Sequence, residues 1–135
     1  MSQNPTQIVE AFCAAFAVKD IEFIVAAMAP DCVYENVPIP AMHGRDAFRA
    51  FISHSLTKTD KLEFVMKAIA ANGDKVLTER VDIFHYGKDQ VAIPLMGIFV
   101  VKDGLIAEWR DYADINSFVT QMTAIGQAPG PGVAT

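Results

Sequence analysis

The chain has few basic residues and no long apolar run. Its 11 lysines and arginines are outnumbered by 16 aspartates and glutamates, which gives a formal net charge of −5. The basic residues form no cluster, which argues against a nucleic acid or an anionic membrane surface as a partner. No apolar segment approaches the length of a membrane span, and the N-terminal sequence MSQNPTQ lacks the charged and apolar regions of a secretion signal. We therefore expect a soluble cytoplasmic protein with no membrane and no nucleic-acid partner.

Cysteine and histidine are also scarce. Cys13 and Cys32 lie in apolar contexts, which favours two buried thiols over a disulfide in a cytosolic protein. His43, His54 and His85 have no cysteine or carboxylate at ligand spacing, whereas zinc needs three or four convergent ligands. The G-x-S-x-G motif of serine hydrolases is missing as well. The sequence therefore predicts no metal site and neither a cysteine nor a serine nucleophile.

At 135 residues and 52% hydrophobic content, the chain fits a single domain with a sizeable core. In the first third, apolar residues recur at helical spacing. Asn4 and Asp20 are suited to cap helix N-termini, Pro5 suits a first helical position, and Pro30 should end the second helix. The helices expected here cover residues 4–20, 20–31 and 44–56, with a short strand and a proline-rich loop between the last two.

After residue 60 the pattern changes to strands. The Asn72-Gly73 and Asp103-Gly104 pairs are strong hairpin signals, so we expect an antiparallel meander. Its four strands cover residues 61–70, 75–86, 90–101 and 105–114, and a helix over 115–125 follows. We assign residues 1–126 to the domain and 127–135 to a flexible C-terminal tail.

Helices followed by a long antiparallel sheet predict an α+β fold in which the helices cover one face of the sheet. A curved sheet closed by helices leaves a cavity lined by every second residue of each strand. The alternation of polar residues along the strands therefore carries information about function.

In three of the predicted strands, functional side chains occupy positions two residues apart and so lie on one face of the strand. Arg80 and Asp82 share one face of their strand, and each has apolar neighbours on the other face. If three strands turn their polar faces inward, one pocket holds Tyr34, Asn36, Arg80, Asp82, Trp109 and Asp111. Alternation alone leaves open an ordinary solvent-exposed charge pair, which would be nearly neutral in energy. Trp109, a large aromatic on the face of Asp111, favours the enclosed arrangement.

The motifs YEN (34–36), GRDA (44–47), TERVD (78–82) and WRDY (109–112), in this order and spacing, resemble the limonene-1,2-epoxide hydrolase family. That family is a branch of the cone-shaped fold shared with nuclear transport factor 2 and the ketosteroid isomerases. The similarity extends from the first helix to about Phe118. It implies a deep apolar pocket, a site made of the same six residues, a homodimer, a small apolar epoxide and water as reactants, and no metal or organic cofactor.

Opening an epoxide with water needs a base for the water and an acid for the leaving oxygen. Two carboxylates in a water-poor pocket resist double ionisation, so one should hold a proton while the other is charged. Following the family, we assign Asp111 as the base and Asp82 as the acid, with the always cationic Arg80 between them. The expected product is a trans-configured vicinal diol, formed in one step without an enzyme ester.

The remaining family roles concern water and substrate. Tyr34 and Asn36 would hold the attacking water in line with the epoxide carbon. Trp109 would orient Asp82 or pack against the substrate.

Apolar residues on the same sheet face should line the pocket, although each could equally be core. By alternation these are Phe84, Ile93 and Leu95, and Phe16 of the first helix could close the pocket. Where many members of the family carry a bulky aromatic two residues after the base, this chain has Ala113. We therefore expect a roomier pocket that accepts larger or bicyclic epoxides.

Two other functions fit the same scaffold. A ketosteroid-isomerase-like or cyclase-like enzyme would use one aspartate for proton transfer at carbon and would not need an arginine between two acids. A non-catalytic binder of hydrophobic ligands is the second alternative, because fold does not determine function. A complete set of acid, base and cation is unusual for a binder.

Overall fold

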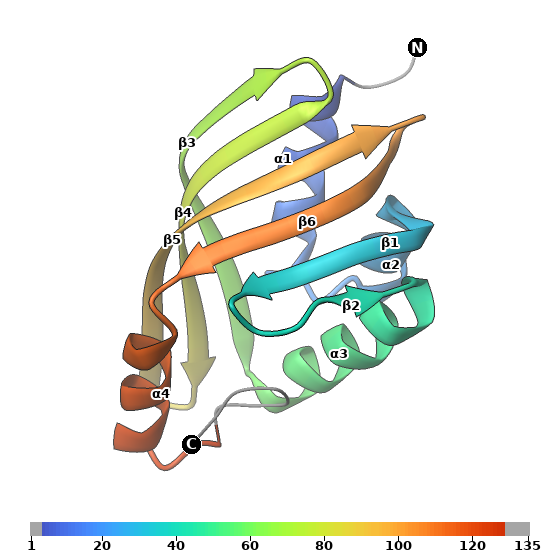
Figure 1. Ribbon diagram of the computed structural model, residues 1–135. Coiled ribbons are helices and arrows are strands. Elements are labelled where there is room, and N and C mark those ends of the chain that lie inside the picture. Colours follow the sequence, from blue (N-terminus) through green and yellow to red (C-terminus); the bar gives the residue numbers. More distant parts are fainter. Residues whose placement is uncertain (1–3, 129–135) are drawn as a thin grey trace.

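A curved six-stranded sheet forms the body of the molecule, and the computed structural model describes residues 4–128 (Figure 1). Its strands lie in the order β2-β1-β6-β5-β4-β3. They span Met28–Val37 (β1), Met42–His43 (β2), Lys61–Asn72 (β3), Lys75–Tyr86 (β4), Asp89–Lys102 (β5) and Leu105–Ala113 (β6). The predicted meander of β3 to β6 is confirmed, and β1 adds to β6 in parallel, which makes the sheet mixed.

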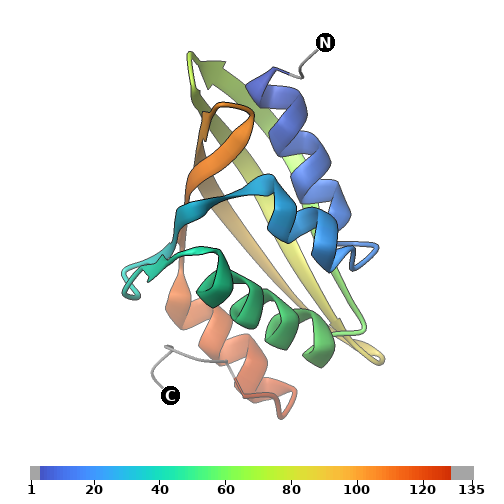
Figure 2. The same cartoon turned by 90° about the vertical axis from the view of Figure 1, so that its right-hand side faces the viewer.

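Within the described residues, four helices accompany the sheet: α1 (Pro5–Ala15), α2 (Ile21–Ala27), α3 (Arg45–Lys58) and α4 (Ile115–Ala124). Figure 2 shows α1, α2 and α3 on one face of the sheet, with α4 beside α3 at the end of the long strands. The predicted α+β class is therefore confirmed. The predicted tail lies outside the described residues except for 127 and 128, both of which are exposed.

The first two helices differ from their predicted bounds. Asn4 caps α1 through a capping box as expected, but the helix ends at Ala15, and Lys19 takes a positive φ of 55° before Asp20 caps α2. The second helix was predicted to continue through Met28 to Pro30, and this was wrong. Proline disfavours helical backbone at the preceding residue, and Met28 instead pairs with Ile106 of β6 at the start of β1.

Irregularities in the ladders accompany the curvature of the sheet. The register shifts between Met66 and Ala68 in β3, and between Val100 and Val101 where β5 meets β6. An extra residue of this kind bends a strand and increases its twist. The concave face is thereby turned toward the helices.

An aromatic cluster fills the space between α1 and the concave face. Phe12 of α1 is fully buried, and its ring centroid lies 5.2 Å from that of Trp109 in an edge-on arrangement. Trp109 also stacks on Phe99, with centroids 5.4 Å apart. Both cysteines are buried and unpaired, as predicted. Among the described residues, no helix combines the length and the apolar character needed to cross a membrane.

Candidate active site

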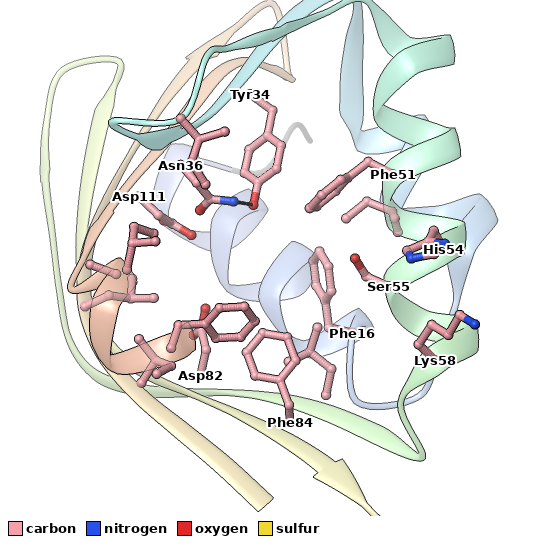
Figure 3. A pocket seen from close by; sticks show the side chains of 18 of the residues that line it. Phe16, Tyr34, Asn36, Phe51, His54, Ser55, Lys58, Asp82, Phe84 and Asp111 are labelled. Atoms are coloured by element: carbon pink, nitrogen blue, oxygen red, sulfur yellow. Dashed lines mark hydrogen bonds between the residues drawn. The ribbon is translucent and has the colours of Figure 1, made fainter. Parts of the chain in front are cut away.

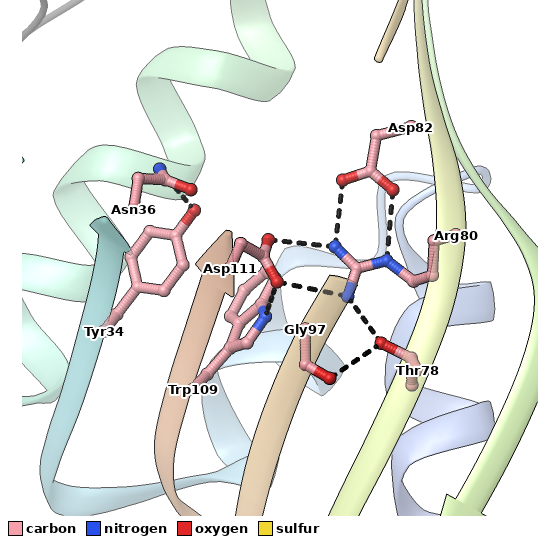
Figure 4. Close-up of polar contacts among 8 residues, drawn as sticks. All are labelled: Tyr34, Asn36, Thr78, Arg80, Asp82, Gly97, Trp109 and Asp111. Atoms are coloured by element: carbon pink, nitrogen blue, oxygen red, sulfur yellow. Dashed lines mark hydrogen bonds and ion pairs between the residues drawn. The ribbon is translucent and has the colours of Figure 1, made fainter. Parts of the chain in front are cut away.

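Four adjacent strands place the polar residues in one row across the concave face. In the register of the sheet, Asn36 of β1 pairs with Asp111 of β6, Asp111 with Gly97 of β5, and Gly97 with Thr78 of β4. Arg80 stands two residues beyond Thr78 on the same face of β4. The structure thus brings Tyr34, Asn36, Arg80, Asp82, Trp109 and Asp111 together on the predicted face (Figure 4). Five of them line the cavity as predicted, whereas Arg80 does not.

The Arg80 guanidinium is fully buried, and all five of its N–H groups are used (Figure 4). Nε and Nη2 donate to Asp82 at 3.1 and 2.9 Å. Nη2 and Nη1 donate to Asp111 at 2.9 and 3.2 Å, and Nη1 donates to the Thr78 hydroxyl at 3.1 Å. A buried arginine with every donor satisfied and two carboxylate partners is held in one orientation.

Gly97 makes this bridge possible. The Arg80 side chain starts on β4 and reaches Asp111 on β6 by passing over β5 at Gly97. A Cβ atom at Gly97 would lie 2.6 Å from Arg80 Nη1, and closer still to Asp111 Oδ1. Thr78 donates its hydroxyl hydrogen to the Gly97 carbonyl, which fixes the oxygen that Arg80 contacts.

Aromatic rings surround the cation. The Phe64 ring of β3 lies under the Arg80 guanidinium, with 4.7 Å between Cζ and the ring centroid. The rings of Phe99 and Trp109 are each 5.8 Å away. Because a cation is attracted to aromatic faces, these contacts partly offset the loss of water.

The two carboxylates differ in their partners. Asp111 accepts three N–H groups, two from Arg80 and one from Trp109 Nε1 at 2.8 Å, whereas Asp82 accepts two from Arg80 alone. Of the two roles predicted for Trp109, orienting Asp82 was wrong, and packing against the substrate stays a prediction for a residue that lines the cavity. Trp109 and Asp111 stand two residues apart on one strand, so the indole reaches the carboxylate on its own strand.

Burial is the main influence on the titration of the site. It raises the pKa of Asp82 to about 6 against the lowering effect of Arg80, and it also raises the pKa of Asp111 above its usual range. Burial alone would lower the pKa of Arg80, but Asp111 and Asp82 outweigh it and hold this pKa above its ordinary value. The site therefore keeps its cation and favours one proton between the two acids.

Two other groups stay neutral. Burial raises the pKa of the Tyr34 phenol above its ordinary value, and Asn36 Nδ2 donates to the phenol oxygen at 2.8 Å. The proton of the Tyr34 hydroxyl is therefore free to be donated elsewhere. Burial also raises the pKa of the Cys13 thiol to about 12, so this cysteine is not a nucleophile.

A cavity of about 160 Å³ opens above the acids (Figure 3). All the predicted apolar lining residues are found there: Phe16, Phe84, Ile93, Leu95, Trp109 and Ala113. Arg80 lies behind the wall, while Asp82, Asp111, Tyr34 and Asn36 reach the cavity. The volume is close to that of an engineered cavity of about 150 Å³ that binds one benzene molecule, so a bicyclic substrate would extend toward the opening.

Several functional residues escaped the sequence analysis. Phe64 shares its strand face with Leu62, which also lines the cavity, so alternation along β3 could have found both. Gly97 could have been recognised because glycine inside a strand often marks a close approach. Among the α3 residues of the lining, Phe51 and Ile52 face inward as helical spacing predicts, whereas His54, Ser55 and Lys58 carry no such signal. Across residues 4–128, no group of three or more potential ligands could hold a metal ion.

Comparisons with known proteins agree with this geometry. The sequence pattern described as "Limonene-1,2-epoxide hydrolase catalytic domain" matches residues 3–124. Epoxide hydrolase EphG of Mycobacterium tuberculosis is 36% identical over 107 residues, which cover 79% of this chain and 71% of that protein. The solved structure of an M. tuberculosis LEH-like epoxide hydrolase superposes with a TM-score of 0.78 at 31% identity, covering 90% of this chain and 93% of that chain.

More distant structures share the fold alone. A putative polyketide cyclase of Pseudomonas putida superposes with a TM-score of 0.78 at 19% identity, covering 89% of this chain and 98% of the other. An NTF2-like protein of Burkholderia pseudomallei gives 0.79 at 19% identity, with coverages of 90% and 98%. The predicted cone fold of the nuclear transport factor 2 type is thereby confirmed. By its sequence and its structure, this chain belongs to the limonene-1,2-epoxide hydrolase catalytic domain family.

Proposed function

We propose that the protein is a cofactor-independent epoxide hydrolase that adds water to a small apolar epoxide in one step. The observation that carries this proposal is the Arg80 guanidinium, which bridges Asp82 and Asp111 at the floor of an apolar cavity. An acid and a base on one side of a dry pocket are what ring opening by water requires. No metal or organic cofactor is needed, because the chain itself supplies the acid, the base and the cation.

Asp111 acts as the base in this mechanism. Its three N–H donors stabilise the charged carboxylate, so the single proton of the pair resides mainly on Asp82. A water molecule between Asp111 and the Tyr34–Asn36 pair gives its proton to Asp111 as its oxygen attacks an epoxide carbon. Asn36 is the sheet neighbour of Asp111, and both residues reach the cavity, which supports this position for the water.

Asp82 acts as the acid. As the carbon–oxygen bond of the epoxide breaks, the proton of Asp82 passes to the leaving oxygen, and the electron pair of that bond stays on oxygen. Attack from the side opposite the leaving oxygen inverts the carbon, so a ring epoxide yields a trans-diol. Arg80 contacts both carboxylates and stabilises the negative charge as it moves from one to the other.

The convex face of the sheet supports a homodimer, which we propose as the working assembly. Large apolar side chains on this face remain between 39% and 51% exposed: Val65, Leu77, Met96 and Tyr112. A patch of this kind is typical of a surface that another chain covers. Sedimentation of the wild type should give a dimer, and Met96→Glu should shift it to the monomer. A monomeric wild type would contradict the assembly.

A panel of cyclic epoxides tests the function directly. The wild type should convert at least one of them to a trans-diol, and cyclohexene oxide and bulkier or bicyclic epoxides together test the effect of Ala113. Asp111→Asn should lower the rate by about 10²- to 10⁴-fold, the usual contribution of general acid–base catalysis, with an unchanged circular dichroism spectrum. A wild-type rate in this variant would remove Asp111 from the mechanism.

The cyclase-like or isomerase-like alternative is tested in the same assay. The solved cyclases share the fold with this chain at under 25% identity, and proton transfer at carbon has no use for a cation between two acids. Isomerisation of an unsaturated ketone, without diol formation from any epoxide, would favour that alternative over hydrolysis. Binding of apolar ligands without any turnover would favour the non-catalytic binder.

A further inference from the structure

The lining of the cavity is polar at two ends and apolar between them. The four groups of the reaction lie at the floor, and the middle is made of aromatic and aliphatic side chains such as Phe16, Phe64 and Phe84. A second polar group stands on α3, on the opposite side from Asp111 (Figure 3). This group, which we call the α3 rim, consists of His54, Ser55 and Lys58.

The α3 rim marks the place where the cavity meets solvent. His54 and Lys58 are exposed and Ser55 is half-buried, whereas the floor residues Asp82 and Asp111 are buried. Residues three and four apart on a helix lie on one face, so His54 and Lys58 stand one above the other. Figure 3 shows the Ser55 hydroxyl turned toward the cavity, with His54 and Lys58 farther out along the same helix.

The rim carries positive charge that the protein itself does not neutralise. Other basic residues of α3 have protein partners: Arg45 donates to the Met28 carbonyl, and Arg49 pairs with Glu22. Within residues 4–128, neither His54 nor Lys58 has a hydrogen-bond or ion-pair partner. Lys58 lies in the last turn of α3, where the helix dipole favours a cation, but this does not account for His54 and Ser55 on the same side.

The cavity is small enough that a substituted substrate must extend to the α3 rim. A volume of about 160 Å³ holds roughly one ring, so any substituent on a ring whose epoxide meets Asp82 and Asp111 must leave through the opening. Among the described charged side chains that line the cavity, the two acids at the floor share one proton and carry a single negative charge, and Lys58 at the opening is positive. A negative group would therefore find no unpaired cation at the floor, because Arg80 is already paired with both acids, and would be attracted to the rim.

We propose that the natural substrate is an amphiphilic epoxide, with a compact apolar body and a carboxylate that binds Lys58, His54 and Ser55 at the α3 rim. This inference rests on the proposed function and modifies its substrate class: the part of the molecule that carries the epoxide stays apolar, and a charged group is added at the other end. The rim orients the molecule with its epoxide toward the acids. Because the rim is exposed, its contribution is modest and falls as salt screens the charges.

A pair of substrates tests the carboxylate-binding role of the rim: an epoxycyclohexane carboxylate and its methyl ester, which at neutral pH differ by one charge and one methyl group. At low ionic strength the wild type should favour the acid over the ester by about 3- to 5-fold in kcat/KM, mainly through KM, and added salt should reduce this preference. Lys58→Gln should bring the ratio close to one, and His54→Gln should lower it less. Lys102→Gln, a change at an exposed lysine of β5 away from the cavity, should leave the ratio at the wild-type value.

The outcomes separate this inference from the proposed function. Two results would overturn the inference that the α3 rim binds a carboxylate while leaving epoxide hydrolysis intact. One is turnover of the ester as fast as the acid, and the other is an equal acid-to-ester ratio of kcat/KM in Lys58→Gln and Lys102→Gln. If neither compound gives a diol, calorimetry with cyclohexane carboxylate and its amide decides the question. If the wild type binds the carboxylate more tightly than the amide and Lys58→Gln loses this preference, carboxylate binding at the α3 rim is supported. Equal binding of the two compounds by the wild type would contradict it.

Discussion

Two pairs of opposite charge occupy opposite faces of the same sheet. Arg80 and Asp82 stand two residues apart on β4 and face the helices, and Glu108 and Arg110 stand two residues apart on β6 and face outward. Both pairs are close, at 2.9 Å inside and 2.6 Å outside. The inner side chains are 0% and 7% exposed, and the outer ones are 26% (Arg110) and 38% (Glu108) exposed.

This comparison shows that separation alone does not determine the energetic importance of an ion pair. In the outer pair of the single chain, water reaches each charged group whether or not the other is present, so the pair contributes little to the folding of that chain. In the inner group, the charges have lost most of their water, and each depends on its partners for compensation. Burial is the main cause of the raised pKa of Asp82 in the inner pair, whereas the pKa of Arg110 in the outer pair is raised mainly by its hydrogen bond to Glu108. A carboxyl pKa raised by burial is the property that catalysis needs.

The comparison is sharpest when the arginine is removed from each pair. Arg80→Met leaves two buried carboxylates without a cation, and we expect the free energy of unfolding to fall by about 3–5 kcal/mol with loss of hydrolysis. Arg110→Met should cost about 0–1 kcal/mol and leave the rate unchanged. Urea denaturation measures both, and equal costs would contradict the contrast between the two faces.

Arg80→Lys tests the same site if the methionine variant fails to fold. Lysine keeps the charge but lacks the planar fork that reaches Asp82, Asp111 and Thr78 at once. We expect this variant to remain folded and to lose most of its activity. Full activity would show that charge alone, without bidentate geometry, is sufficient.

A smaller change separates geometry from charge. Gly97→Ala keeps every charge but places a methyl group against Arg80 Nη1 and Asp111 Oδ1, so the bridge must shift. A displacement of about 1 Å in a catalytic group can cost about 10²-fold in rate, and we expect a loss of that order in steady-state kinetics. Gly104→Ala, at φ 77° in a turn with open space around it, should reduce stability and keep the rate. Equal rates in the two variants would contradict the role of Gly97.

The pH dependence of stability gives the smallest effect. The pKa of Asp82 is raised from an ordinary 3.8 to about 6 in the folded protein, so the folded state binds the proton more tightly than the unfolded state. The stabilisation that this provides is complete below pH 4 and is lost as the pH rises through about 6. Relative to Asp82→Asn, the wild type should therefore lose stability across this window in urea titrations. A difference that stays constant with pH would contradict a raised pKa at Asp82.

Alternation along the strands predicted the inner group because side-chain direction follows strictly from strand geometry. It did not decide which face turned inward, since Val81 and Ile83 make the other face of β4 apolar as well. Trp109 resolved that question correctly, because a large aromatic is rarely placed in water next to a carboxylate. Its actual partner, Asp111, could have been inferred from the spacing of two residues on one strand.

The sequence did not predict the features that depend on pairing between distant segments. The early end of α2 follows from the pairing of Met28 with β6, and the helical spacing of the local sequence does not record this. The positions of His54 and Lys58 at the opening depend on how α3 crosses the sheet, which the amphipathic pattern of the helix leaves undefined. Alternation along a strand and spacing along a helix thus predict which residues lie on the same face. Contacts between distant segments determine whether that face packs on the core, lines the cavity or meets solvent.

A single turnover in oxygen-18 water tests the central claim, direct attack of water activated by Asp111, most directly. With enzyme in excess over an epoxide that the protein converts, the account predicts that the first diol formed carries one oxygen-18 atom and that the protein carries none. An unlabelled first diol, with the label appearing in the carboxylate of Asp82 or Asp111, would mean attack by a carboxylate through an ester and would contradict it.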